Sequence, residues 1–161
     1  MSQLLLLVAT LFSTLQTVRP ATAARERPDF SGNWRLEHVA GDPRSRSIGG
    51  PSFFVGSAVT IQQWGDRLTL TQTAPRALPA LTFSLDGLDS RNTLPNFHDG
   101  TLWQFTSRAR WEYNTLVIET TGAWETKMRW SITSAGKLSI QDWAPSIDLG
   151  TSVNATLYSR R

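Results

Sequence analysis

Cysteine is absent from this chain of 161 residues. Its absence excludes a disulfide scaffold, a cysteine-liganded zinc site, an iron–sulfur cluster and a thiol nucleophile. Histidine is scarce too, because His38 and His98 are the only two, and the sequence predicts both in loops. Neither has a partner at H-x-H or H-x-x-x-H spacing, so exposed loop histidines are favoured over a His/Asp metal site or a haem ligand. We therefore expect no metal site and no cofactor.

Sequence signatures of catalysis are missing as well. The chain has no G-x-S-x-G element, no phosphate-binding loop and no dinucleotide fingerprint. Asp86-Gly87 and Asp99-Gly100 are explained by turn chemistry. Glu112, Glu119 and Glu125 fall on neighbouring predicted strands, where pairing with bases across the sheet accounts for them. We predict a protein that is not an enzyme and has no catalytic residue.

Charged residues make up only 18% of the chain and nearly balance, with 16 basic against 13 acidic side chains. Nucleic-acid binding requires a strongly positive surface, so we exclude that class of partner. The densest internal basic spot is Arg44-Ser45-Arg46, which is more typical of a solvated loop than of a phosphate site. With 40% hydrophobic residues, the chain has enough apolar material for one folded domain.

The N-terminus, Met1–Ala24, has the pattern of a secretory signal peptide. The apolar run Leu4–Leu15 is followed by a proline and by Ala21 and Ala23 in an A-x-A arrangement. The run is too short to span a hydrocarbon core of about 30 Å. We predict a secreted or periplasmic domain, residues 25–161, that keeps no stable membrane anchor after cleavage. A short N-terminal anchor or a docked helix is the alternative.

The rest of the chain alternates apolar and polar residues, with turn signals between the runs and no sustained helical period. In Thr101–Trp111, for example, every second side chain from Trp103 onward is apolar or small. We predict loops at His38–Gly56 and Leu88–Gly100. The predicted strands are Ser31–Glu37, Ala58–Gln63, Arg67–Thr73, Leu78–Leu85, Thr101–Trp111, Thr115–Thr121, Ala123–Thr133, Lys137–Trp143 and Thr151–Tyr158.

Consecutive hairpins of this kind form a meander with one apolar face. Such a sheet must close on itself or be covered, and too few residues remain for a covering layer of helices. We therefore predict an all-β fold, an up-and-down antiparallel barrel of about eight or nine strands.

Seven tryptophans in a chain of this size are the most unusual feature of its composition. Core filling is the favoured explanation, at roughly two to one, and the lining of a ligand cavity is the other. Small Ser107 and Ala109 between bulky Phe105 and Trp111 could leave room inside. The residues that we expect to line the interior and bind a ligand are Trp103, Phe105, Trp111, Trp124, Met128 and Trp130.

Phe30-Ser31-Gly32-Asn33-Trp34 resembles the G-x-W opening of lipocalins and other calycins. The mature chain as a whole is similar to a group of secreted bacterial lipocalin-like proteins of unknown function. The resemblance implies that Trp34 plugs one end of the barrel, with Arg160 or Arg129 stacked on it. A second lipocalin motif of the T-D-Y type and a helix after Tyr158 are missing, and avidin-like barrels and barrel-shaped protease inhibitors have similar openings. The matching segments are Pro28–Trp34, Gln63–Leu68, Leu85–Gly87, Arg110–Thr120 and Trp130–Ile140.

Together these features predict a lipocalin-like barrel that binds an apolar or amphipathic small molecule without a covalent bond. Desolvation of the ligand against inward aromatic side chains would drive the binding. The alternative is an envelope or extracellular interaction module that resembles protease-inhibitor barrels. It would contact a protein partner, whose identity the sequence leaves open, through the Arg44/Arg46 loop and the Asp89–Gly100 loop.

Overall fold

The computed structural model describes residues 27–41, 56–96, 99–122, 125–146 and 150–161. The predicted signal peptide, Trp124, His98 and the Arg44/Arg46 loop lie outside these ranges. Within them, no helix has the length and apolar character needed to cross a membrane. The strands are β1 (Gly32–Gly41), β2 (Ala58–Trp64), β3 (Arg67–Ala74), β4 (Leu81–Ser84), β5 (Asp89–Pro95), β6 (Leu102–Glu112), β7 (Thr115–Gly122), β8 (Thr126–Ile132), β9 (Leu138–Ser146) and β10 (Gly150–Arg160).

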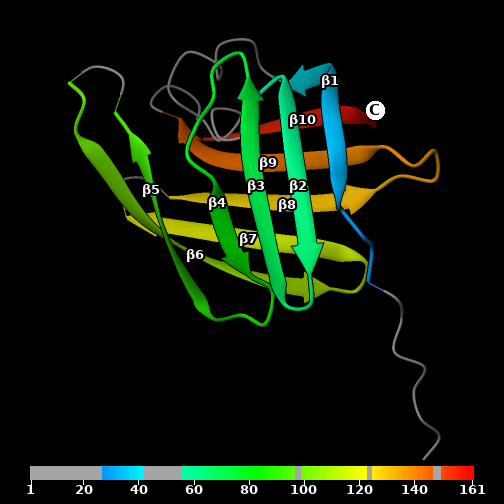
Figure 1. The fold of residues 1–161 in the computed structure, drawn as a ribbon, viewed down its shortest axis with the longest axis horizontal. Helices are drawn as coiled ribbons and strands as arrows, with labels where there is room; N and C mark the ends of the chain where they lie inside the picture. The colour runs from blue at the N-terminus through cyan, green and yellow to red at the C-terminus, as the bar shows by residue number, and fades with distance from the viewer. Residues whose placement is uncertain (1–26, 42–55, 97–98, 123–124, 147–149) are drawn as a thin grey trace, which may run out of the picture.

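The ten strands form one antiparallel sheet in the order β4-β3-β2-β1-β10-β9-β8-β7-β6-β5 (Figure 1). Each strand pairs with its sequence neighbour, except that β4 and β5 share no ladder and β1 pairs with β10. The pairing of the first and last strands runs from Trp34↔Arg160 to Gly41↔Asn154 and curls the meander into a nearly closed barrel. The predicted all-β, up-and-down antiparallel architecture is confirmed, with ten strands rather than eight or nine.

Two predicted loops are wrong in part because strands occupy them. β1 continues through His38 to Gly41, and a bulge between Leu36 and His38 shifts its register, which breaks the two-residue period that the prediction needed. His38 therefore lies exposed on a strand. β5 occupies Asp89–Pro95, and its inward side chains include a polar one, Asn92, so its sequence has little apolar alternation.

The alternation predicted from the sequence places one side chain of every two inside the barrel. On β6, Phe105, Ser107 and Ala109 are buried, whereas Gln104 and Arg108 on the other face are exposed. The buried apolar side chains form one core, which includes the large residues Trp34, Trp130, Phe30, Phe83 and Tyr158. This shared apolar interior is the main stabilising element of the fold.

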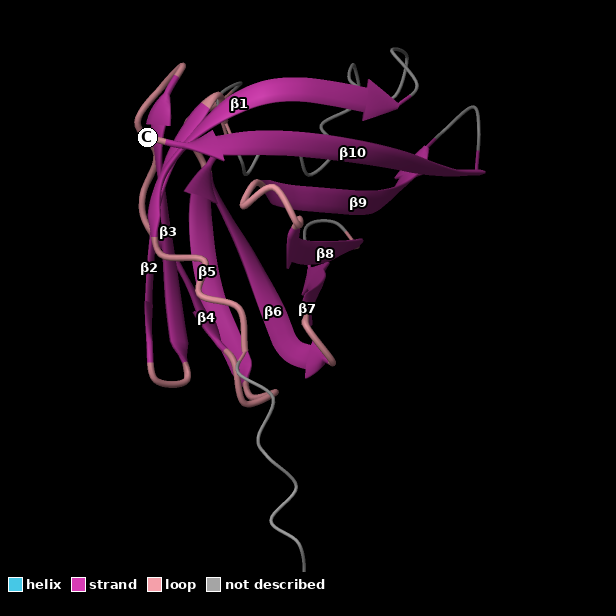
Figure 2. Ribbon diagram, turned by 90° about the vertical axis from the view of Figure 1, so that its right-hand side faces the viewer, coloured by secondary structure: helices cyan, strands magenta, loops and turns pink. Residues whose placement is uncertain are grey.

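The meander places the turns after β2, β4, β6 and β8 at one end of the barrel, and Figure 2 shows the first three of them at the bottom. We call this the plugged end, because Phe30, Trp34 and Trp111 fill it. Tight turns need residues in the left-handed region, and Gly65 in the β2–β3 turn has a φ of 56°. β1, β3, β5, β7 and β9 end toward the opposite end of the barrel.

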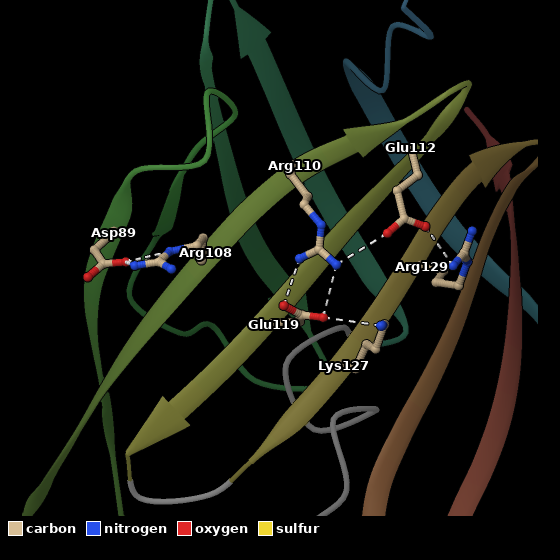
Figure 3. A network of polar contacts seen from close by, with 7 residues as sticks. All are labelled: Asp89, Arg108, Arg110, Glu112, Glu119, Lys127 and Arg129. Carbon is tan, nitrogen blue, oxygen red and sulfur yellow. Dashed lines mark hydrogen bonds and ion pairs between the residues drawn. The ribbon is translucent and has the colours of Figure 1, made fainter.

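The outer faces of β6, β7 and β8 carry a network of ion pairs (Figure 3). Arg110 contacts Glu119 at 2.7 Å and Glu112 at 3.2 Å, and Arg129 contacts Glu112 at 2.9 Å. Lys127 adds a second cation 3.1 Å from Glu119. Hydrogen bonds from Arg110 and Lys127 lower the pKa of Glu119 to about 2. The predicted pairing of Glu112 and Glu119 with bases is confirmed.

Candidate ligand-binding interior

An aromatic plug closes one end of the interior. The indole Nε1 of Trp34 donates a hydrogen bond of 2.8 Å to the carbonyl oxygen of Phe30, which ties the strand to the segment before it. The Phe30 ring stacks on Trp111 with centroids 5.7 Å apart and meets the edge of Trp130 at 6.0 Å. Ring pairs in these geometries are worth about 0.5–1.5 kcal/mol beyond the area that they bury. Ring contacts and one hydrogen bond therefore hold the plug together.

A basic side chain covers the Trp34 plug from outside. The Arg160 guanidinium lies 4.9 Å from the centroid of the Trp34 ring, so of the two predicted candidates the structure selects Arg160. Arg129 instead belongs to the outer ion network. A second cation, Arg27, lies 5.6 Å from the Trp111 ring. Cation–π contacts of this kind contribute about 0.5–2 kcal/mol each.

Polar side chains form a belt inside the barrel, on the same inward faces as the apolar core. Ser107 and Thr120 share a buried hydrogen bond of 2.9 Å between their hydroxyl oxygens. The other buried polar residues on inward positions of β3, β5, β8, β9 and β10 are Gln72, Asn92, Thr126, Asp142 and Thr156. Burying a polar group costs free energy unless it is hydrogen-bonded, so each of these side chains needs a partner inside the barrel.

Several polar atoms of the interior have no hydrogen-bond partner among the described residues. They are Gln72 Oε1, Thr126 Oγ1 and the indole nitrogens of Trp111 and Trp130. Buried polar atoms are nearly always paired, and each unpaired one costs about 1–3 kcal/mol. Such atoms call for a partner that the described protein does not supply, such as water or a ligand.

Tyr158 joins the apolar core to the polar belt. Its ring is fully buried, and its hydroxyl donates a hydrogen bond of 3.1 Å to the carbonyl oxygen of Gly56. Burial raises the pKa of Tyr158, and the nearby Asp142 carboxylate raises it further. The phenol consequently keeps its proton across the physiological range and acts as a hydrogen-bond donor.

Side chains close the seam between β4 and β5, which we define as the place where the backbone ladder is missing. The Asn92 amide accepts a hydrogen bond of 2.8 Å from the Thr82 N–H and donates one of 2.9 Å to the Thr82 carbonyl. Ser90 Oγ accepts a further bond of 2.7 Å from the Ser84 N–H. Two side chains thus replace the backbone bonds that a neighbouring strand would make.

Two hollows lie among the described residues near this seam. One, of about 540 Å³, is lined by β5, β6 and the end of β7, including Arg91, Gln104 and Thr121. The other, of about 530 Å³, crosses the seam between Thr82 and Ser90. Exposed side chains make up much of both linings, so both are features of the outer surface.

The structure distributes the predicted ligand-binding residues over three environments. Phe105, Met128 and Trp130 are buried and face inward. Trp111 is half-buried in the plug, where it stacks on Phe30. Trp103 is half-exposed near the opposite end of β6, and Trp124 lies outside the described residues.

The polar belt is the part of the interior that the sequence analysis missed. Its signal was present, because Thr126 shares the alternation phase of Met128 and Trp130, and Asp142 shares that of Leu138 and Ile140. Reading every in-phase residue as inward, whether apolar or polar, would have found the belt.

The predicted contact loop Asp89–Gly100 needs a correction. Asp89–Pro95 forms strand β5, paired along its length with β6, and Asn92 and Leu94 from it point into the barrel. Most of this segment is therefore part of the wall rather than a free loop.

Comparison with known proteins gives structural matches alone. No protein-family model matches the sequence, and no curated protein matches it. The zebrafish ileal bile acid-binding protein complexed with cholic acid is similar at a TM-score of 0.60 and 24% identity, over 82% of this chain and 98% of that one. The fluorescent protein UnaG matches at 0.59 and 20% identity, over 82% and 97%.

A fatty acid-binding protein from the brain of Drosophila melanogaster is also similar, at a TM-score of 0.56 and 20% identity, over 81% of this chain and 99% of that one. All three identities are below 25%, so the likeness concerns the fold. The chain therefore shares the antiparallel barrel fold of these proteins, two of which are named for the small molecules that they bind. The more specific resemblance to secreted bacterial lipocalin-like proteins stays a prediction.

Proposed function

We propose that the chain binds an amphipathic small molecule, without a covalent bond, inside the barrel. The carrying observation is the polar belt, whose Thr126 Oγ1 and Gln72 Oε1 are buried and without a partner among the described residues. A ligand head group with hydroxyl, amide or acid groups would satisfy these atoms. The apolar body of the ligand would lie against inward Phe105, Met128 and neighbouring aliphatic side chains.

The free energy of binding would come mainly from the apolar body. Removing apolar surface from water contributes about 25 cal/mol per Å², whereas the polar belt fixes the orientation of the ligand. Two of the similar structures support this class of ligand, since one holds cholic acid and another is a fatty acid-binding protein. The predicted residues Trp103, Trp111, Trp124 and Trp130 would report on the ligand through their fluorescence.

Titration of the protein with fatty acids, bile acids, haem and hydrophobic dyes, followed by tryptophan emission, tests the proposal. A saturable change with at least one compound is the expected result. Thr126→Val should then weaken binding of that compound about five-fold or more, because a hydrogen bond to the ligand is lost. If none of these compounds changes the emission, the proposal fails.

Thr121→Val is the matched control, since Thr121 lies on the neighbouring strand β7, is exposed and lines the outer hollow of about 540 Å³. It should leave the affinity unchanged. Weaker binding in Thr121→Val together with unchanged binding in Thr126→Val would place the ligand in the outer hollow and overturn an interior site.

We also propose that residues 1–24 direct export and are then removed. The support is the sequence pattern, an apolar run of 12 residues, Leu4–Leu15, ahead of Ala21-x-Ala23. Cell fractionation should find the protein secreted or in the periplasm, and N-terminal sequencing should begin at Ala24 or Arg25. A cytoplasmic protein that retains Met1 or Ser2 would refute export.

A further inference from the structure

Four large apolar side chains are strongly exposed among the described residues. They are Trp64, Leu88, Leu102 and Tyr113. Three of them lie at the plugged end, with Trp64 at the β2–β3 turn, Leu88 in the β4–β5 turn and Tyr113 in the β6–β7 turn. Figure 2 shows these three turns at the bottom of the molecule. Leu102 begins β6 and lies at the opposite end.

The strand order makes these three turns consecutive around the rim. β2 and β3 lie beside β4 on one side of the seam, and β6 and β7 follow β5 on the other. The turn that carries Leu88 is therefore in the middle, flanked by those that carry Trp64 and Tyr113. We call these three residues the apolar tips. Exposed apolar residues scattered singly need no explanation, but this set is gathered on one end.

The barrel gains little from the apolar tips. Trp64 is 88% exposed and Tyr113 85% exposed, so neither packs into the core. Tyr113 also has a φ of 56°, in the left-handed region that costs residues other than glycine about 1–2 kcal/mol. Asparagine or glycine would suit that position better. An exposed aromatic residue that destabilises its own turn indicates a role outside the fold.

Three ion pairs lie beside the apolar tips. Arg27 pairs with Asp66 at 3.3 Å beside the first tip. Arg108 pairs with Asp89 at 2.8 Å beside the second, and Arg129 pairs with Glu112 at 2.9 Å beside the third. A strongly charged partner would meet no complementary field here. This local charge balance favours a partner surface that carries no net charge.

The spacing of the apolar tips favours lipid over protein. The tips are separated by polar turn residues such as Asp66 and Asp86, so they form no continuous patch that could become the dry core of a protein interface. Single Trp, Tyr and Leu side chains can enter the headgroup region of a bilayer one by one, and Trp and Tyr are enriched there. The polar residues between them remain hydrated among the headgroups.

The chain outside the described structure joins the barrel at the same end. Arg27 is the first described residue and lies against Asp66 and the Trp111 ring. The apolar run Leu4–Leu15 precedes it in the sequence. The apolar tips therefore lie at the end of the barrel where the preceding chain enters.

We propose that the plugged end docks reversibly on a neutral, zwitterionic phospholipid bilayer, with Trp64, Leu88 and Tyr113 inserted into the headgroup region. The opposite end of the barrel then faces away from the lipid. Insertion of three side chains gives reversible binding rather than a stable anchor.

Flotation of the full chain with phosphatidylcholine vesicles tests this proposal, and all variants keep the same N-terminus. The protein should float with the vesicles, and acyl-chain-brominated lipid should quench its tryptophan emission less in Trp64→Phe. Leu88→Ser should weaken binding about ten-fold, as expected for a buried leucine side chain. Leu102→Ser is the matched control, because both leucines are 65% exposed but lie at opposite ends. It should bind like the unchanged protein.

Tyr113→Asn separates docking from folding. It should raise the thermal stability because it relieves the left-handed strain, and at the same time weaken vesicle binding several-fold. A salt increase from about 0.05 to 0.5 M should change the affinity less than about two-fold, because little net charge is involved.

Four results would overturn the proposal. The first is that the protein does not float with the vesicles, and the second is that Leu88→Ser and Leu102→Ser weaken vesicle binding equally. The third is binding that requires anionic lipid and vanishes in salt. The fourth is a dimer in solution that Leu88→Ser dissociates. The last result would make this end an interface between two copies of the chain.

Discussion

The barrel is joined in two different ways at the two places where a meander could open. Between β1 and β10 a backbone ladder runs from Trp34↔Arg160 to Gly41↔Asn154. Between β4 and β5 the side chains of Asn92 and Ser90 make the connections instead. A ladder uses peptide groups that every residue other than proline carries, so it tolerates substitution. The seam depends on two particular side chains.

The two junctions also differ in what lies behind them. The β1–β10 ladder is backed by the Trp34 plug and its Arg160 contact. The seam is backed by Leu81, Phe83 and Leu94, and one of the outer hollows crosses it. We expect the seam to be the first part of the wall to open, since local stability follows the number and kind of bonds that must break.

The largest expected effect concerns the ladder side. Trp34→Ala removes the plug and the bond to Phe30, and should lower the free energy of unfolding by about 4 kcal/mol. The backbone ladder between β1 and β10 remains in this variant. We therefore expect the whole barrel to lose stability, rather than these two strands alone. Urea unfolding measures it, and Trp64→Ala, which removes an equally large but exposed side chain, should cost less than about 0.5 kcal/mol. Loss of hydrogen-exchange protection restricted to β1 and β10 would contradict a global effect.

The next effect tests the seam directly. Asn92→Ala leaves the Thr82 N–H and carbonyl without their partners and should cost about 2 kcal/mol. Amide exchange at Thr82 should accelerate more than exchange in β1 or β10. Asn33→Ala is the control, since Asn33 also bonds a neighbouring strand, through Thr60, but lies where a ladder exists. If the two variants lost the same free energy of unfolding, the seam would be no weaker than the ladder.

Ser90→Ala removes the remaining side-chain bond across the seam. We expect a cost of about 1 kcal/mol and faster amide exchange at Ser84. Ser139→Ala on β9, a strand with ladders on both sides, should change the stability less than half as much. If Ser84 exchanges at the same rate in Ser90→Ala as in the unchanged protein, Ser90 does not close the seam.

The smallest effect comes from the outer ion network, which adds side-chain bonds to strands that are already paired. The folded pKa of Glu119 is lowered from 4.5 to about 2, so its contribution to stability is present above pH 4.5 and is lost as the pH falls toward 2. Because Glu119 is about 40% exposed, we expect less than about 1 kcal/mol.

Glu119→Gln should therefore flatten the acid limb of the stability–pH curve between pH 4.5 and 2 while barely changing stability at low pH. Glu125→Gln, which alters an exposed acid outside the network shown in Figure 3, should leave the curve unchanged. If Glu119→Gln lowered the free energy of unfolding more than Asn92→Ala, the ion network would contribute more to stability than the seam.

The wall of the barrel was largely predictable because a two-residue period is a local property. The alternation in Thr101–Trp111 predicts both the strand β6 and its inward face, and the structure confirms this for Phe105, Ser107 and Ala109. The period fails where the backbone departs from regular pleating. The bulge after Leu36 hid the second half of β1, and the polar inward Asn92 hid β5.

The interior was predictable only in part, because the sequence gives the phase of a side chain and not its depth in the barrel. Phe105, Met128 and Trp130 face inward as predicted, whereas Trp103 lies near the end of a strand and remains half-exposed. The polar belt was overlooked because threonines and an aspartate in a strand are ordinarily taken as solvent-facing.

The sequence by itself determined the class of fold, since alternation, turns and the lack of helical periodicity leave a closed antiparallel meander as the stable solution. The resemblance of its G-x-W segment to calycin openings also implied the Trp34 plug. Only the tertiary structure decided that β4 and β5 meet through side chains, that unpaired polar atoms gather inside, and that three exposed apolar tips share one end. The inward phase of the polar side chains is a local property. Their missing hydrogen-bond partners, the pairing across the seam and the grouping of the tips depend instead on how the curvature of the sheet brings distant strands together.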